Sequence, residues 1–196
     1  MASLLGRSPS RSDAIEQRCT APSTPPLIDL TYAAHLRIGE VMGLQRRDLD
    51  LNAGVLRVSR QLTLAGKLTQ TKTGEGRSVE LPAFAVEAMA DYLNGKELGP
   101  MQPLFVRPDG KPLLRSYVQR VFREAQEGIG PEPFHFHDLR HAGLTLYAQG
   151  GATIKETMDR GGHSTQRAAL IYQHAAAGRK VELAGNLDLA MRRPAT

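Results

Sequence analysis

Cysteine is almost absent from this chain of 196 residues, tryptophan is absent, and aromatic residues make up only 5%. The single cysteine, Cys19, excludes an intrachain disulfide and favours a reducing compartment. One cysteine also cannot anchor a zinc site, and no histidine/cysteine cluster has the spacing of metal ligands. We therefore expect a protein that uses neither a metal nor another cofactor.

Long apolar runs are absent as well. The first ten residues contain only Leu4 and Leu5 as an apolar pair, which is too short for a signal peptide. No stretch approaches the roughly 20 apolar residues of a membrane span. We therefore expect a soluble, cytoplasmic protein with no membrane partner.

The charge of the chain is moderately basic. Lysine and arginine number 25 against 20 acidic residues, which gives a net charge of +5 and a pI near 9.6. This balance suits a polyanionic partner such as nucleic acid, although many basic proteins bind none.

Two regions of the chain differ in composition. Residues 1–26 are rich in Ser, Pro and Arg and show no hydrophobic period, so we predict a mostly disordered tail. From Leu27 onward apolar residues recur at steps of three and four, as in amphipathic helices. We expect one folded domain over residues 27–196.

The pattern within this domain predicts a mainly helical α+β fold with one small antiparallel sheet. Three strand-like segments, separated by turn signals, predict a three-stranded meander over residues 55–58, 67–70 and 78–81. Apolar spacing and cap residues predict helices over residues 27–42, with a break near 35–37, over residues 83–93, and over residues 117–125 with Ser116 as N-cap. A further helix is predicted from about Asp138 to Gly150. It is followed by a short helix that a Thr153/Glu156 capping box opens and Gly161-Gly162 ends, and by a helix that Ser164 caps and that includes Tyr172.

The candidate functional residues fit the needs of phosphodiester chemistry. Such a reaction requires a nucleophile, cations or donors on the non-bridging oxygens, and an acid for the leaving oxygen. Without a metal, arginine is the suitable cation because its fork matches phosphate geometry. Arg37 lies among apolar residues and should need a partner, and Glu40 is three residues away. Without other motifs, the simplest interpretation of Arg37 and Glu40 would be an ion pair with a structural role.

Two further segments carry histidine, arginine and tyrosine. His137 and Arg140 are spaced to share one helix face, within a segment that has three histidines in seven positions. His163 follows two glycines and is expected at a helix N-terminus, where backbone N–H groups favour an anion. Tyr172 lies in an Ala/Leu/Ile-rich helix, where core packing is the usual role of a tyrosine.

The order of these motifs resembles the catalytic domain of the tyrosine recombinases, the phage-integrase family. The matching residues are Arg37 and Glu40 in Leu-Arg-x-Gly-Glu, His137 and Arg140 in His-x-x-Arg-His, His163 in Gly-His-Ser, and Tyr172. The motif stretches cover residues 36–50, 70–82 and 134–175, within a resemblance that runs from about Leu27 to the end. Each motif is weak alone, but the ordered set is specific.

The resemblance implies site-specific DNA recombination, the integration or excision of a mobile element. Tyr172 would attack the scissile phosphate to give a 3′-phosphotyrosine and a free 5′-hydroxyl. Arg37 and Arg140 would hold the non-bridging oxygens, His163 would donate a further hydrogen bond, and His137 would act in proton transfer with the nucleophile.

A lysine in the turn before the last strand completes the family's set as general acid. Lys72 fits that position, and Lys67 is the alternative. A solvent-facing turn lysine is the competing interpretation of Lys72. Glu40 would support the arginines without taking part in the chemistry.

The sequence departs from the family's pattern at two points. Family members normally carry a separate N-terminal helical domain that binds DNA, and only the 26-residue tail precedes residue 27 here, so we expect that domain to be absent. Family members also commonly have Thr-Gly before the Leu-Arg, where this chain has Ala34-His35.

The resemblance implies double-stranded DNA as the partner, a homotetramer assembled on it, accessory DNA-bending proteins, and association with the nucleoid. An apolar strip of Leu183, Leu187 and Met191 could link protomers or fold back on its own core. Two alternatives remain open: a DNA-binding remnant that no longer recombines, and a topoisomerase with the same phosphotyrosine chemistry, which the short arginine-to-tyrosine spacing disfavours.

Overall fold

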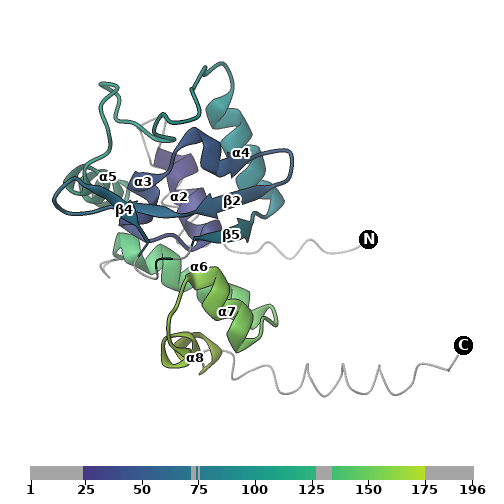
Figure 1. The fold of residues 1–196 in the computed structure, drawn as a ribbon. Helices are drawn as coiled ribbons and strands as arrows, with labels where there is room; N and C mark the ends of the chain where they lie inside the picture. The colour runs from purple at the N-terminus through teal and green to yellow at the C-terminus, as the bar shows by residue number, and fades with distance from the viewer. Residues whose placement is uncertain (1–23, 72–73, 75, 127–133, 175–196) are drawn as a thin grey trace, which may run out of the picture. The chain divides into compact units, whose positions relative to one another are not determined.

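The computed structural model describes residues 24–71, 74, 76–126 and 134–174, and the chain divides into two compact units, Met1–Gly143 and Leu144–Thr196. Figure 1 labels the main elements. The helices are α2 (Thr24–Ala34), α3 (Ile38–Gly43), α4 (Ala83–Leu93), α5 (Arg115–Gln126), α6 (Phe136–Gln149), α7 (Ile154–Gly161) and α8 (Gln166–His174), with a 3₁₀ turn at Arg46–Asp48. The strands are β1 (Leu49–Asp50), β2 (Val55–Val58), β3 (Arg60–Leu62), β4 (Leu68–Gln70) and β5 (Arg77–Glu80). The α+β, mainly helical fold is thus confirmed.

Helix α2 begins earlier than the sequence indicated. Thr24, Pro25 and Pro26 form its first turn, so the predicted disordered tail is wrong for these three residues. Proline is tolerated there because the first N–H groups of a helix have no intrahelical partner. The prediction for residues 1–23 lies outside the described residues.

The predicted break between the first two helices is present and has a defined geometry. His35 has a φ of 53°, in the left-handed region that favours glycine. The chain therefore turns sharply after α2, and Arg37 becomes the extended N-cap residue of α3 instead of lying inside a helix. The departure from the expected motif at Ala34-His35 thus falls at the residue that adopts this left-handed conformation.

The small antiparallel sheet is present, but its membership differs from the prediction. Strand β2 pairs with β5 on one side, with Leu56 opposite Val79, and with β1 on the other. The segment Leu68–Gln70 pairs instead with β3 in a separate two-stranded ladder. The predicted meander is therefore wrong in its middle strand, because alternation marks a strand without identifying its partner.

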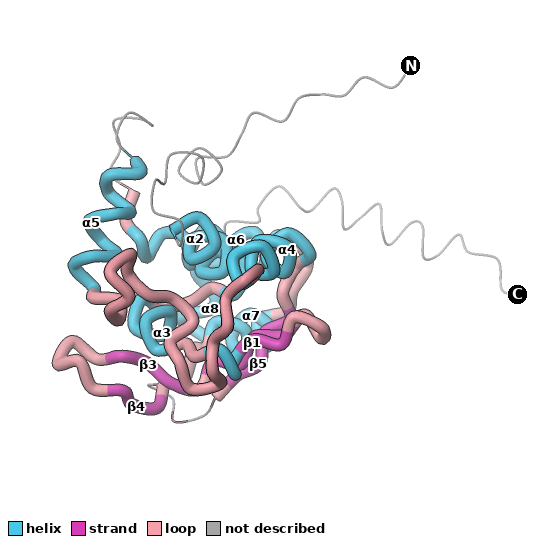
Figure 2. Tube along the Cα trace, turned by 90° about the horizontal axis from the view of Figure 1, so that it is seen from above, coloured by secondary structure: helices cyan, strands magenta, loops and turns pink. Residues whose placement is uncertain are grey.

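The helices of the first unit pack around a continuous apolar core. Leu30, Leu36, Leu56 and Leu139 have no more than 1% of their surface exposed. Figure 2 shows α2 and α4, which pack against each other, on one side and the strands on the other. Within the described ranges, no helix has the length and apolar character needed to cross a membrane.

Two predicted helix boundaries had different outcomes. Helix α4 covers the predicted range of residues 83–93. Helix α5 begins at Arg115, so Ser116 lies within its first turn and is not its N-cap, as the amide of Val118 already bonds to the carbonyl of Leu114.

Gly143 allows α6 to approach the turn that follows α2. A Cβ atom there would collide with the backbone carbonyl of Tyr32 and lie 2.6 Å from Nδ1 of His35. We expect Gly143→Ala to lower the free energy of unfolding by about 1–3 kcal/mol, because a backbone carbonyl cannot move aside cheaply. Urea unfolding measures this. A stabilised variant, as helix propensity alone would give by about 1 kcal/mol, would contradict the account.

The second unit contains α7 and α8, which pack together. The predicted Thr153/Glu156 capping box is confirmed: Glu156 donates its N–H to the Thr153 hydroxyl, and its carboxylate accepts the Thr153 N–H. Helix α7 ends at Gly161, and Gly162 follows it in the left-handed conformation with a φ of 60°. Leu144, Ala148 and Tyr172 form a small buried cluster.

Candidate active site

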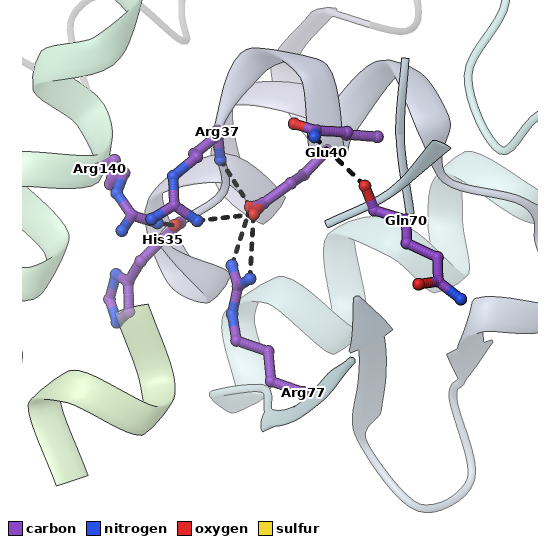
Figure 3. A network of polar contacts seen from close by, with 7 residues as sticks. His35, Arg37, Glu40, Gln70, Arg77 and Arg140 are labelled. Carbon is purple, nitrogen blue, oxygen red and sulfur yellow. Dashed lines mark hydrogen bonds and ion pairs between the residues drawn. The ribbon is translucent and has the colours of Figure 1, made fainter. Parts of the chain in front are cut away.

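The best-defined polar feature of the first unit is a buried carboxylate between two arginines. Glu40, on α3, has 1% of its side chain exposed and accepts four hydrogen bonds. Arg37 contributes its backbone N–H at 2.9 Å and Nη1 at 2.8 Å, while Arg77 on β5 contributes Nη1 at 3.0 Å and Nη2 at 2.8 Å. Figure 3 shows the two guanidinium groups reaching the carboxylate from different elements.

These hydrogen bonds keep Glu40 ionised. Burial alone would raise its pKa, but the hydrogen bonds and charge of Arg77, with the backbone N–H and charge of Arg37, outweigh it and lower the pKa to about 2. The cluster of two arginines and one carboxylate therefore carries a net positive charge at neutral pH. The Arg37 side chain is 28% exposed, so part of that charge faces solvent.

Arg140 is held at the turn that carries Arg37. It lies on α6, is 2% exposed, and donates Nη1 to the backbone carbonyl of His35. The left-handed conformation of His35 therefore occurs at the residue whose carbonyl anchors this buried guanidinium. The turn 35–37 thus brings the two predicted arginines, 103 positions apart in sequence, to one place (Figure 3).

His137 lies in the first turn of α6 and shares the electrostatic environment of both arginines. Partial burial is the largest cause that lowers the pKa of His137, followed by the charges of His141 and Arg140, with a smaller effect of Arg37. The rings of His137 and His141 meet edge to face, with centroids 4.5 Å apart. His137 is therefore neutral at pH 7 and able to accept a proton.

His163 and Tyr172 meet within the second unit. Their rings are stacked with centroids 5.7 Å apart and planes 8° apart, and Tyr172 is 4% exposed. Gly161 makes room for the imidazole, because a Cβ atom there would lie 2.8 Å from Cε1 of His163. Helix α8 begins at Gln166, so Thr165 precedes it and the prediction of Ser164 as its N-cap is wrong by one position. His163 lies three residues before the helix, so its expected place at the helix N-terminus is also wrong.

The general-acid candidates have different outcomes. Lys72 lies outside the described residues. Lys67, the alternative, is an exposed residue of the turn between β3 and β4, where its carbonyl accepts the Thr63 N–H. Among the residues that the structure describes, no three His, Cys, Asp or Glu side chains gather in a way that could hold a metal ion.

Sequence reasoning missed two groups of this site, the side chain of Arg77 and the backbone carbonyl of His35. Arg77 is two positions before the buried Val79 on β5, so the two-residue period of a strand could have placed it on the inward face. The role of the His35 carbonyl had no such signal, since a backbone contact with Arg140 over 105 positions leaves no trace in residue types.

The sequence profile of the phage integrase family matches residues 1–179, so the chain belongs to this family. It is 37% identical over 190 residues to a protein described as the prophage phiRv2 integrase of Mycobacterium tuberculosis H37Rv, covering 92% of this chain and 50% of that protein. It is 38% identical over 163 residues to the integrase of Mycobacterium phage D29, covering 78% and 43%. The chain thus spans about half the length of these relatives.

Solved structures share the fold. The crystal structure of the XerA recombinase matches with a TM-score of 0.72 at 19% identity, over 100% of this chain and 67% of that one. The Tn1549 transposon integrase in complex with circular intermediate DNA matches with a TM-score of 0.71 at 20% identity, over 93% and 68%. The expected fold of a tyrosine-recombinase catalytic domain is confirmed.

Proposed function

We propose that this chain is the catalytic part of a site-specific DNA recombinase that cleaves and rejoins strands through a 3′-phosphotyrosine intermediate. The observation that carries the proposal is that Arg37 and Arg140 are held at one turn, and that Arg37 and Arg77 together outweigh the negative charge of Glu40. Such a cluster suits a phosphodiester, whose transition state carries added negative charge on its non-bridging oxygens. Membership of the phage integrase family supports the same reaction.

In the proposed cleavage step, Tyr172 displaces the 5′-oxygen from the scissile phosphate. Oη of Tyr172 forms a bond to phosphorus while the bond to the 5′-oxygen breaks, so the bond energy is kept in the phosphotyrosine. His137 accepts the tyrosine proton, and Lys72 gives a proton to the leaving 5′-oxygen. Arg37, Arg140 and His163 stabilise the non-bridging oxygens. Attack by a 5′-hydroxyl from another duplex reverses the step and joins the strands.

The burial of Tyr172 adds a requirement to this scheme. Tyr172 has 4% of its surface exposed and its ring is stacked on His163, so this side chain would have to become more exposed to reach a DNA phosphate. We infer that DNA binding is coupled to a movement of α8 or its surroundings. That movement would break the stack of Tyr172 on His163, and such aromatic pairs contribute about 0.5–1.5 kcal/mol.

The proposed partner is double-stranded DNA, in line with the DNA complexes among the structural neighbours. A λ integrase fragment is described as a dimer on a core site, and the Tn1549 integrase as bound to a circular intermediate. We extend this to a homotetramer on DNA, with accessory DNA-bending proteins, acting at the nucleoid in the cytoplasm. Integration or excision of a mobile element is the process in which such a protein acts.

We predict a pH dependence of cleavage that reports His137. Its lowered pKa keeps the imidazole neutral at pH 7, and protonation as the pH falls below that pKa blocks proton acceptance. The cleavage rate should fall about tenfold per pH unit on the acid side. Single-turnover rates from pH 5 to 8 measure this limb.

Two variants control for this assignment. His137→Gln should remove the acid limb, whereas His141→Gln should move it to higher pH, because the charge of His141 is one cause of the lowered pKa. An unchanged limb in His137→Gln would assign the titration to another group.

The function is tested by covalent trapping. Nicked duplexes that tile the DNA flanking the gene are incubated with the full chain, and each reaction is run on a denaturing and a native gel. A protein–DNA band that survives denaturation supports the proposal. A native shift without such a band favours the DNA-binding remnant, and the absence of both contradicts the proposed function.

A further inference from the structure

Arg77 makes the more extensive side-chain contact with the buried carboxylate. Its two terminal nitrogens bond to both oxygens of Glu40, at 3.0 and 2.8 Å, while the Arg37 guanidinium bonds to Glu40 through Nη1 at 2.8 Å. This fork-to-carboxylate arrangement fixes orientation as well as distance. Arg77 is 11% exposed, so solvent screens the contact only weakly.

The position of Arg37 depends on this contact through Glu40. Glu40 accepts both the backbone N–H and Nη1 of Arg37, and so orients the start of α3 and the guanidinium together. If Arg77 were removed, the carboxylate would be left with Arg37 as its one cationic partner among these contacts, and the two charges would cancel. The positive charge available to a phosphate would fall, although Arg37 itself would be unchanged.

We propose that Arg77 is a positioning residue for DNA cleavage: it holds Glu40 in place and compensates its charge, so that Arg37 presents its guanidinium and its charge to the scissile phosphate. The inference rests on the proposed function, since it assigns Arg37 to that phosphate. It adds a residue on the strand β5 to a site otherwise formed by residues of helices and turns.

A second buried pair in the same unit provides a matched control. Asp48 is 3% exposed, accepts the backbone N–H of Gln45 at 2.7 Å, and is paired with Arg60 at 2.5 Å. Arg60 lies on β3 and is 15% exposed. This pair repeats the construction of Glu40 and Arg77, a strand arginine on a buried carboxylate that caps a short helical turn, but it has no contact with Arg37 among those described.

The experiment compares Arg77→Met, Arg77→Lys and Arg60→Met in the full chain. Single-turnover cleavage is measured at saturating nicked duplex, alongside DNA affinity and urea unfolding. Each variant is also tested on a duplex whose scissile phosphate carries a methyl group in place of one non-bridging oxygen. That substrate has a neutral phosphorus centre and so needs less positive charge from the protein.

We expect Arg77→Met to slow cleavage of the normal duplex on the order of ten- to a hundredfold, by analogy with residues that orient the ligands of a metal site through hydrogen bonds. The loss should be several times smaller on the methylated duplex, and Arg77→Lys should recover part of the rate because it restores the charge. Arg60→Met should lose about as much stability as Arg77→Met but should cleave at a rate similar to that of the wild type.

The outcomes separate the two proposals. Equal losses on both duplexes, or an Arg60→Met rate as low as that of Arg77→Met, would overturn the positioning role while leaving the proposed function intact. A wild-type chain that forms no adduct with either duplex would overturn the proposed function and the role of Arg77 with it.

Discussion

Replacing Glu40 by glutamine is expected to lower the free energy of unfolding by about 3–5 kcal/mol, the range for removing one partner of a buried ion pair. Glutamine keeps the size of the side chain but removes the charge that compensates Arg37 and Arg77. Arg77 would then be left largely buried, and Arg37 partly buried, beside a neutral group. Urea unfolding at pH 7 measures the loss.

The pH dependence of this loss follows from the lowered pKa. Because Glu40 has a pKa of about 2 in the folded state against 4.5 as its ordinary value, its contribution is fully present above pH 4.5 and is lost as the pH falls toward 2. The contribution amounts to about 3 kcal/mol, at 1.36 kcal/mol for each pKa unit. The wild type and Glu40→Gln should therefore converge in stability as the pH is lowered.

A control for this effect is available on the surface. Glu124 pairs with Arg120 on α5, with both side chains 50% exposed, and Glu124→Gln should change stability by no more than about 0.5 kcal/mol. A difference between the wild type and Glu40→Gln that stayed constant from pH 7 to pH 3 would contradict the charge-based explanation.

Tyr172→Phe is expected to abolish covalent adduct formation and leave DNA binding unchanged. The substitution removes only the hydroxyl oxygen, which is the proposed nucleophile, and keeps the ring that stacks on His163 and packs in the buried cluster. Denaturing gels measure the adduct, and native gels measure binding.

Tyr147 is the matched control, since it lies in the same unit with the Arg160 guanidinium 4.6 Å from its ring centroid. Tyr147→Phe should still form the adduct. If the Tyr172→Phe chain retained the adduct, the nucleophile would have to be another residue.

Much of the local structure could be predicted from the sequence because its signals are local. The Thr153/Glu156 capping box, the break before Arg37 and the extent of α4 each depend on neighbouring residues. Strand pairing depends on partners far along the chain, and the segment at residues 68–70 was therefore assigned to the wrong ladder.

The contacts of the site divide in the same way, because those between neighbouring residues could be predicted from the sequence and those between distant residues could not. The Arg37–Glu40 pair is three residues apart and could be expected from helical spacing, whether its role is structural or functional. The contact of Arg77 with Glu40 spans 37 positions, and that of Arg140 with the His35 carbonyl spans 105. Ordered motifs indicated that the arginines belong together, but only the fold shows the carboxylate and the carbonyl that hold them.

The most direct test of the proposed mechanism is to identify the residue that carries DNA in the trapped adduct. The denatured adduct is digested with a protease and a nuclease, and the peptide that retains a nucleotide phosphate is sequenced by mass spectrometry. We predict that the modification lies on Tyr172, on the 3′-phosphate side of the cleaved strand. A modification on any other residue, or attachment through a 5′-phosphate, would contradict the account.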